Sequence, residues 1–205
     1  MGKRADVPKV NAGSMADIAF LLLIFFLVTT SIETDVGIDR LLPKIEKDTT
    51  IATVKQKNIL RVLINEEGEL LVDGIVVQMH ALKQSAIDFL DNGGSPSGEM
   101  GHCNYCMGNK SLDSSDNPTK AIISLTSHRK TSYGDYITVQ NELVAAYNTL
   151  RNREAQRLFK QDYTQLEADF ANPNALQLQK EEVKSKIKII QELFPMKLSE
   201  LETNN

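Results

Sequence analysis

The chain lacks the short motifs that would point to catalysis. It contains no phosphate-binding loop, no arrangement of a nucleophile with its base and no metalloprotease motif. We therefore do not expect an enzyme. We also expect no bound cofactor and no nucleic-acid partner.

Basic residues are missing from the longest apolar stretch of the chain. There is no Lys, Arg or His between Ser14 and Ile32, yet Asp17 lies inside this stretch. An ionised carboxylate costs about 2.5–3.5 kcal/mol near the centre of a bilayer. Because nothing else in the stretch can pair with it, we expect Asp17 either to meet a partner on another chain or to take up and release a proton.

The apolar stretch has the length of one transmembrane helix. About 20 residues cross ~30 Å of hydrocarbon, and residues 12–32 meet that requirement. No later stretch is long enough to span the bilayer again. Basic residues precede the stretch and acidic residues follow it, which places residues 1–11 in the cytoplasm and the remainder outside it. These flanking charges are Lys3, Arg4, Lys9, Glu33, Asp35 and Asp39.

Three other interpretations of the stretch compete with a functional membrane helix. A cleaved signal peptide would end at a site of small residues, and residues 29–33 (TTSIE) form a poor one. A buried core helix would not be apolar all round over this length. A plain membrane anchor in which Asp17 is incidental is the serious alternative.

On a helix, the stretch places Asp17 on an otherwise aliphatic stripe that ends at Ser31. We expect this stripe to meet protein rather than lipid. The hydroxyl groups near its outer end can donate hydrogen bonds to backbone carbonyls or hold water. An ordinary helix end at the membrane interface explains them equally well. The residues assigned to the proton path or the helix interface are Ser14, Leu21, Ile24, Val28, Thr29, Thr30 and Ser31.

A linker (33–57), a compact domain (58–155) and an extension (156–205) follow. Apolar runs between turn residues predict strands, and spacings of three and four predict helices. The fold class is therefore α/β (α+β): a single N-terminal transmembrane helix, then two helices on one face of a mixed sheet, then a helical extension. Strands are expected at 59–64, 69–72, 75–77, 121–125 and 194–198, helices at 79–90, 136–170 and 175–193, and a Gly/Ser-rich loop at 92–118.

Cys103 and Cys106 form a C-x-x-C pair in that loop. The pair is open to three interpretations, namely a disulfide, a redox pair and half of a metal site. Haem attachment would need a histidine where Met107 stands, and a zinc site would lack ligands. Because the loop should face an oxidising compartment, we expect a local disulfide without a catalytic role.

Two short basic segments follow the first predicted helix of the domain. Residues 128–130 (HRK) follow a predicted strand and suit either a partner, such as the cell wall, or a solvated loop. The basic residues of 151–160 are interpreted as a solvated helix face. His80 is expected at the surface.

The run from Ser14 to Phe26, SMADIAFLLLIFF, resembles the membrane signature of the ExbD/TolR family, and the layout is similar too. A short basic start, one span, a linker with the pair Leu42-Pro43 and a small outer domain follow in the same order. The strands at 58–77 and 121–125 and the helix start at 133–135 resemble those of the family. The likeness fades across the Gly/Ser-rich loop and after about residue 155.

The resemblance implies a subunit of the bacterial inner membrane, present as a dimer inside a pentameric ring of ExbB or TolQ type. Asp17 would take protons that move down their gradient, and the motion would be passed to TonB or TolA. Leu42 and Pro43 would contribute to partner binding in the linker. Peptidoglycan is a further partner to test, and the run from Ser14 is closer to ExbD than to TolR.

Two readings from other classes remain open. The chain would be a binding module if the span were only a tether, or a thiol-redox protein if Cys103 and Cys106 were its active pair.

Overall fold

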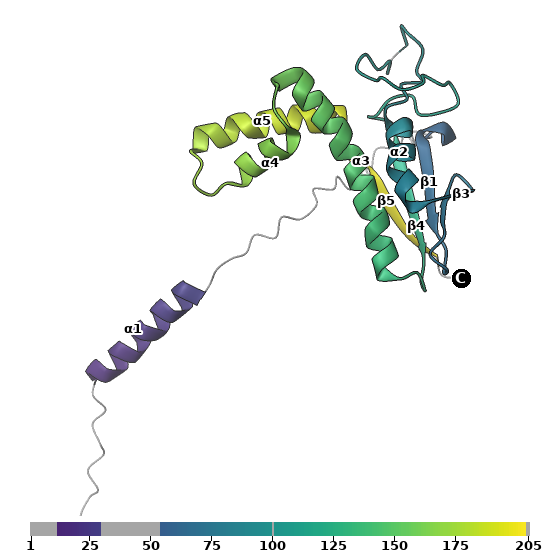
Figure 1. Ribbon diagram of the computed structural model, residues 1–205. Coiled ribbons are helices and arrows are strands. Elements are labelled where there is room, and N and C mark those ends of the chain that lie inside the picture. The colour runs from purple at the N-terminus through teal and green to yellow at the C-terminus, as the bar shows by residue number, and fades with distance from the viewer. Residues whose placement is uncertain (1–11, 30–53, 100, 204–205) are drawn as a thin grey trace, which may run out of the picture. The chain divides into compact units, whose positions relative to one another are not determined.

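The computed structural model describes residues 12–29, 54–99 and 101–203, and the chain divides into two units. Helix α1 (Ala12–Thr29) is the only described element of the first unit, and all others belong to the second (Figure 1). Within these described ranges, no helix is both long and apolar enough to cross a membrane. The expected end of the span at residues 30–32 and most of the expected linker lie outside the described residues.

A five-stranded sheet organises the second unit, in the order β3-β2-β1-β4-β5. Strands β1, β2 and β3 form an antiparallel meander, whereas β4 runs parallel to β1 and β5 runs parallel to β4. The sheet is therefore mixed, as predicted. Its strands are β1 (Ile59–Ile64), β2 (Leu70–Val72), β3 (Ile75–Val77), β4 (Ile122–His128) and β5 (Leu198–Thr203).

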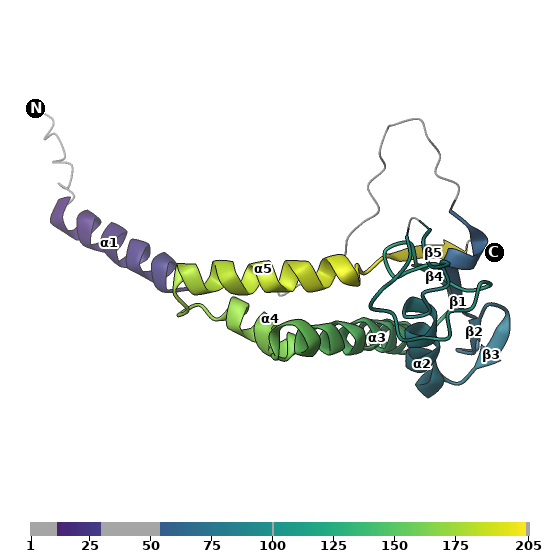
Figure 2. The ribbon, with the colours of Figure 1, turned by 90° about the horizontal axis from the view of Figure 1, so that it is seen from above.

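Helices α2 (Met79–Leu90) and α3 (Tyr133–Phe159) cover the same face of this sheet (Figure 2). Alternate residues of β1 point toward them, because side chains on a strand alternate between faces. The helices pack against the sheet with apolar residues spaced three and four apart. The buried core contains Leu60, Val62, Ile64, Ile123 and Leu125 from the strands, and Leu82, Ala86, Leu90, Val139, Leu143, Ala146 and Tyr147 from the helices.

The long helix ends earlier than predicted. Instead of running to about residue 170, α3 stops at Phe159, and Lys160 adopts the left-handed conformation with φ 57°. The chain then turns into α4 (Tyr163–Ala171). This turn allows α4 to pack against α5 (Gln177–Leu193), which forms a second small core of Ala155, Tyr163, Leu166, Ile187 and Ile190.

The last strand begins later than predicted. Residues 194–197 belong to no strand, because Phe194 and Met196 are buried in the main core as the chain leaves α5. Strand β5 starts only at Leu198, where it pairs with Ile123 of β4. The extension after residue 155 is thus not wholly helical, since its final segment completes the sheet.

Candidate functional site

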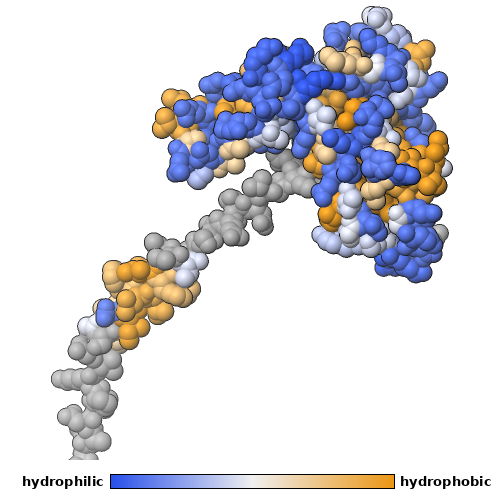
Figure 3. Space-filling view, in the orientation of Figure 1, coloured by the Kyte–Doolittle hydropathy of each residue, from blue (hydrophilic) through white to orange (hydrophobic). Residues whose placement is uncertain are grey.

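Helix α1 carries one carboxylate on an apolar surface. Asp17 and every side chain from Met15 to Phe26 are exposed in the chain, and the face of the helix seen in Figure 3 is mostly apolar. Among the described residues, Asp17 has neither a hydrogen bond nor an ion pair. Helix α1 therefore presents an acidic group that nothing in the described part of the chain neutralises.

The predicted stripe falls on one side of α1. At about 100° per residue, positions 17, 21, 24 and 28 lie within roughly 60° of one another. Leu21 and Ile24 are exposed on this side, and Thr29 Oγ1 donates a hydrogen bond to Phe25 O at 2.7 Å. Ser14 and Val28 are placed only by their backbone in the helix, while Thr30, Ser31, Leu42 and Pro43 lie outside the described residues.

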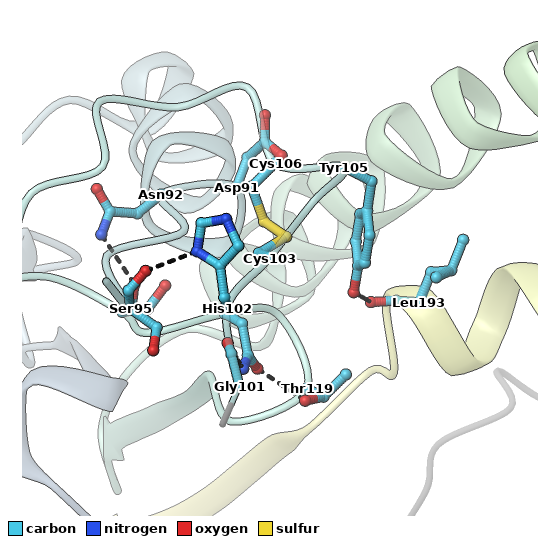
Figure 4. The surroundings of a disulfide bond; sticks show 12 residues. Asp91, Asn92, Ser95, Gly101, His102, Cys103, Tyr105, Cys106, Thr119 and Leu193 are labelled. Carbon is cyan, nitrogen blue, oxygen red and sulfur yellow. Dashed lines mark hydrogen bonds between the residues drawn. A yellow bond between two sulfur atoms is a disulfide. The ribbon is translucent and has the colours of Figure 1, made fainter. Parts of the chain in front are cut away.

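Cys103 and Cys106 are joined by a disulfide with a Cα–Cα distance of 5.6 Å, and both are buried (Figure 4). The bond packs against Gly93, whose φ is 65°. A Cβ on Gly93 would lie 2.7 Å from the Cβ of Cys106, so both the backbone conformation and the close packing require glycine here. The described residues contain no group of three or more His, Cys, Asp or Glu side chains suited to a metal.

The described part of the loop 92–118 contains no strand or helix and is held by hydrogen bonds of both backbone and side chains. The Asn92 amide donates to Ser111 O at 2.9 Å and to Ser115 O at 2.8 Å, while its oxygen accepts from the Ser111 N–H. Farther along, the Tyr105 hydroxyl donates to Leu193 O at 2.9 Å. Burial, assisted by the charges of Glu154 and Asp91, raises the pKa of Tyr105 to about 12. The described residues of this loop are therefore an ordered part of the domain.

Asp116 ties this loop to the start of the domain. Its side chain is 4% exposed and lies 2.6 Å from Lys57 Nζ, with Lys55 and Lys120 within 4 Å. Asn58 Nδ2 donates to its carboxylate, and its own N–H donates to Asn58 Oδ1. Burial opposes ionisation of Asp116, but the hydrogen bonds from Lys57 and Asn58 and the lysine charges outweigh it and lower its pKa.

The prediction that the basic residues of 151–160 form a solvated helix face is wrong for Arg151 and Arg153. Arg151 is 5% exposed, donates twice to Phe194 O at 3.1 and 3.0 Å, and lies between two tyrosine rings. Arg153 forms a two-pronged pair with Asp91 at 2.5 and 2.8 Å. Because both partners lie more than 40 residues away in sequence, the local charge pattern could not reveal them. One signal was available, since Arg151 follows the buried Tyr147 by one helical turn.

The three basic residues 128–130 have different surroundings in the structure. Lys130 pairs with Glu66 at 2.8 Å on the surface, whereas His128 and Arg129 line an open cleft of roughly 490 Å³. The cleft lies where β4, β5 and the start of α3 meet, and Tyr136 crosses it by donating to Glu200 at 2.8 Å. His80 is exposed on α2, in agreement with its expected surface position.

Comparison with known proteins places these elements in a class of biopolymer transport components. A family model described as "Biopolymer transport protein ExbD/TolR" matches residues 3–152. The match covers most of the chain, and the chain therefore belongs to the ExbD/TolR family, as its resemblance to that family predicted. No match is found among the curated proteins compared.

The family match covers only part of the folded domain. The match includes α1 with Asp17, the sheet strands β1–β4 and the first part of α3. It ends at residue 152, so α4, α5 and β5 lie beyond it. Members of this family are components of transport complexes and act with partner proteins.

Proposed function

We propose that the chain is a proton-driven motor subunit of an inner-membrane complex of ExbB–ExbD type, which energises TonB-dependent transport across the outer membrane. In this proposal residues 12–32 span the inner membrane once. The N-terminus is cytoplasmic and the folded domain is periplasmic. The chain acts without enzymatic chemistry, as a dimer inside a pentameric ring, and hands motion to a TonB-like protein.

The proposal depends mainly on the position of Asp17 in α1. It is the single acidic residue of α1, the helix has no basic residue, and the family match includes it. A carboxyl group can be neutral in lipid and ionised when wet, which an arginine cannot be, since arginine keeps its charge. A charge that moves through the membrane potential gains about 2.3 kcal/mol per 100 mV, comparable with the cost of exposing an ionised carboxylate to lipid. Protonation of Asp17 can therefore switch α1 between two positions.

The stripe of α1 supplies a surface for the partner ring. Leu21 and Ile24 lie on the same side as Asp17, so a ring that covers the stripe would shield the carboxyl group from lipid. Ser14, Thr29, Thr30 and Ser31 would offer hydroxyl groups at the two ends of this path. No cofactor is needed, because the transported protons are the only reactants.

The substitution Asp17→Asn tests the proposal. The amide keeps the size of the side chain but cannot ionise, so the variant should insert and assemble with a co-expressed ring subunit, yet lose energised uptake. Mass measurement of the detergent-extracted complex reports assembly, and uptake of a TonB-dependent substrate reports function. Asp88→Asn is the matched control, because Asp88 is exposed on α2 and its substitution should leave uptake unchanged. Uptake that persists in Asp17→Asn would overturn the proposed role in TonB-dependent transport.

Two alternatives predict different results in the same strains. A TolR-like subunit of a Tol–Pal-type motor would leave uptake intact in Asp17→Asn and instead weaken the outer membrane, measured as sensitivity to detergent. A membrane-tethered binding module would tolerate Asp17→Asn in both assays. A thiol-redox protein would lose function in Cys103→Ser, which the motor proposal expects to be nearly silent for uptake.

A further inference from the structure

The outer end of the α4–α5 hairpin carries apolar side chains that the domain does not bury. Leu176 is 70% exposed, Leu178 is 82% exposed and Phe170 is 41% exposed. In Figure 3, apolar atoms gather at this end of the hairpin, away from the sheet. We refer to residues 170–179 as the hairpin tip.

These side chains are not a poorly packed part of the hairpin core. That core is complete without them, since Tyr163, Leu166, Ile187 and Ile190 are buried between α4, α5 and the end of α3. The tip is therefore an apolar surface held on a folded support. An exposed cluster of this kind marks a binding surface more often than scattered single residues do.

The hairpin tip also contains no charged residue. Its sequence, FANPNALQLQ, lies between Asp169 and Lys180, in a chain of which 24% of residues are charged. Its polar members are Asn172, Asn174, Gln177 and Gln179, so no ionised side chain of the tip would have to enter the apolar layer of a bilayer. Protein-binding surfaces are usually enriched in arginine and aromatic anchors, and the only such anchor of the tip is Phe170.

We propose that the hairpin tip inserts into the surface of the lipid bilayer, with Leu176 and Leu178 as its lipid-facing side chains. This inference rests on the proposed membrane anchoring by α1. Residues 30–53 connect α1 to the domain and reach at most about 85 Å, which keeps the domain near the membrane. At the high local concentration that such a tether provides, a few apolar side chains are enough for reversible insertion.

The absence of tryptophan from the chain permits a direct test. The full chain carrying Leu178→Trp has a single tryptophan, which would report the tip after reconstitution into vesicles that contain acyl-chain-brominated phosphatidylcholine. We expect its fluorescence to be quenched and shifted to shorter wavelength. Phe20→Trp on α1 is the reference for the membrane helix. Leu112→Trp, in the exposed part of the 92–118 loop, is the reference for a water-facing residue.

Each outcome decides a separate point. Quenching of Leu178→Trp well above that of Leu112→Trp supports insertion of the tip. If only Phe20→Trp is quenched, the anchor stands and the tip proposal is wrong. A shift to shorter wavelength without quenching would mean that protein, such as a second copy of the chain, covers the tip, which also overturns the proposal. If Phe20→Trp is not quenched either, the membrane anchoring in the proposed function fails as well.

A second substitution shows whether the neighbouring leucine contributes. Adding Leu176→Asp to the Leu178→Trp chain places a carboxylate at the tip, and we expect most of the quenching to be lost. Ile75→Asp is the matched control, because Ile75 is equally exposed but lies on β3. Equal quenching with Leu176→Asp and with Ile75→Asp would contradict insertion through the tip.

Discussion

The one charged side chain of α1 differs from the buried charged side chains of the folded domain in whether it has partners within the chain. In the described part of the domain, every buried side-chain nitrogen and oxygen has a hydrogen-bond partner. Asp116 is surrounded by lysines, and Arg151 is held by a carbonyl and two rings. On α1, Asp17 has no such partner among the described residues. The buried charges of the domain are satisfied within the described part of the chain, whereas the charge of α1 is not.

This difference separates stability from function. A buried charge with partners in the same chain matters chiefly for folding, because its removal leaves those partners unsatisfied. A charge without such partners is dispensable for folding, so its presence in an apolar helix requires another explanation. The proposed motor supplies one for Asp17, and three variants of the domain test the comparison.

The largest expected effect is that of Arg151→Met. The variant loses two charge-assisted hydrogen bonds to Phe194 O and the contacts with Tyr147 and Tyr163, so we expect about 2–4 kcal/mol of destabilisation. Urea unfolding of the full chain in mild detergent, followed by circular dichroism, measures this change. Asp17→Asn should leave the same transition unmoved. A large shift with Asp17→Asn, or none with Arg151→Met, would break the comparison.

Removal of the disulfide should have the next largest effect. The bond closes a loop of only a few residues, for which the chain-entropy relation gives about 2 kcal/mol. We expect the double variant Cys103→Ser, Cys106→Ser to lose this amount in urea unfolding. A reductant should destabilise the native chain similarly and leave the double variant unchanged. If the reductant acts equally on both, the effect does not come from this bond.

The smallest effect is the pH dependence contributed by Asp116. Its pKa is lowered in the folded state, so its stabilisation is present above the unfolded value of about 3.9 and is lost as the pH falls through the folded value. We therefore expect Asp116→Asn to be less stable than the native chain at pH 7, with a difference that narrows below about pH 4. Unfolding midpoints at pH 7, 5 and 3 measure it. A difference that is constant with pH would contradict the assigned role of the carboxylate, and exposed Asp88→Asn serves as the control.

Local sequence pattern was enough to predict the first half of the domain. The predicted strands at 59–64 and 75–77 and the helix at 79–90 agree with β1, β3 and α2 at both ends. In these elements the spacing of the apolar residues and the positions of the turn residues predict the same structure. The mixed sheet followed from the alternation of strands and helices.

The errors arose where distant residues decide the local structure. Lys160 carries no turn signal, yet it ends α3 because α4 gains a core by folding back onto α5. The strand at the end of the chain was predicted at Phe194 and Met196 because they are apolar, but these side chains fill the main core instead. Arg151 and Arg153 appeared solvated for the same reason, since the groups that hold them come from other parts of the chain.

Because β5 pairs in parallel with β4, the α4–α5 hairpin is attached to the domain at both of its ends. Its first end continues from α3, and its second end returns to the sheet through Phe194 and Met196. A mechanical load on the hairpin would therefore be divided between a helix and a strand of the same domain. Such an arrangement also lets the hairpin lengthen or shorten without altering the sheet that supports it.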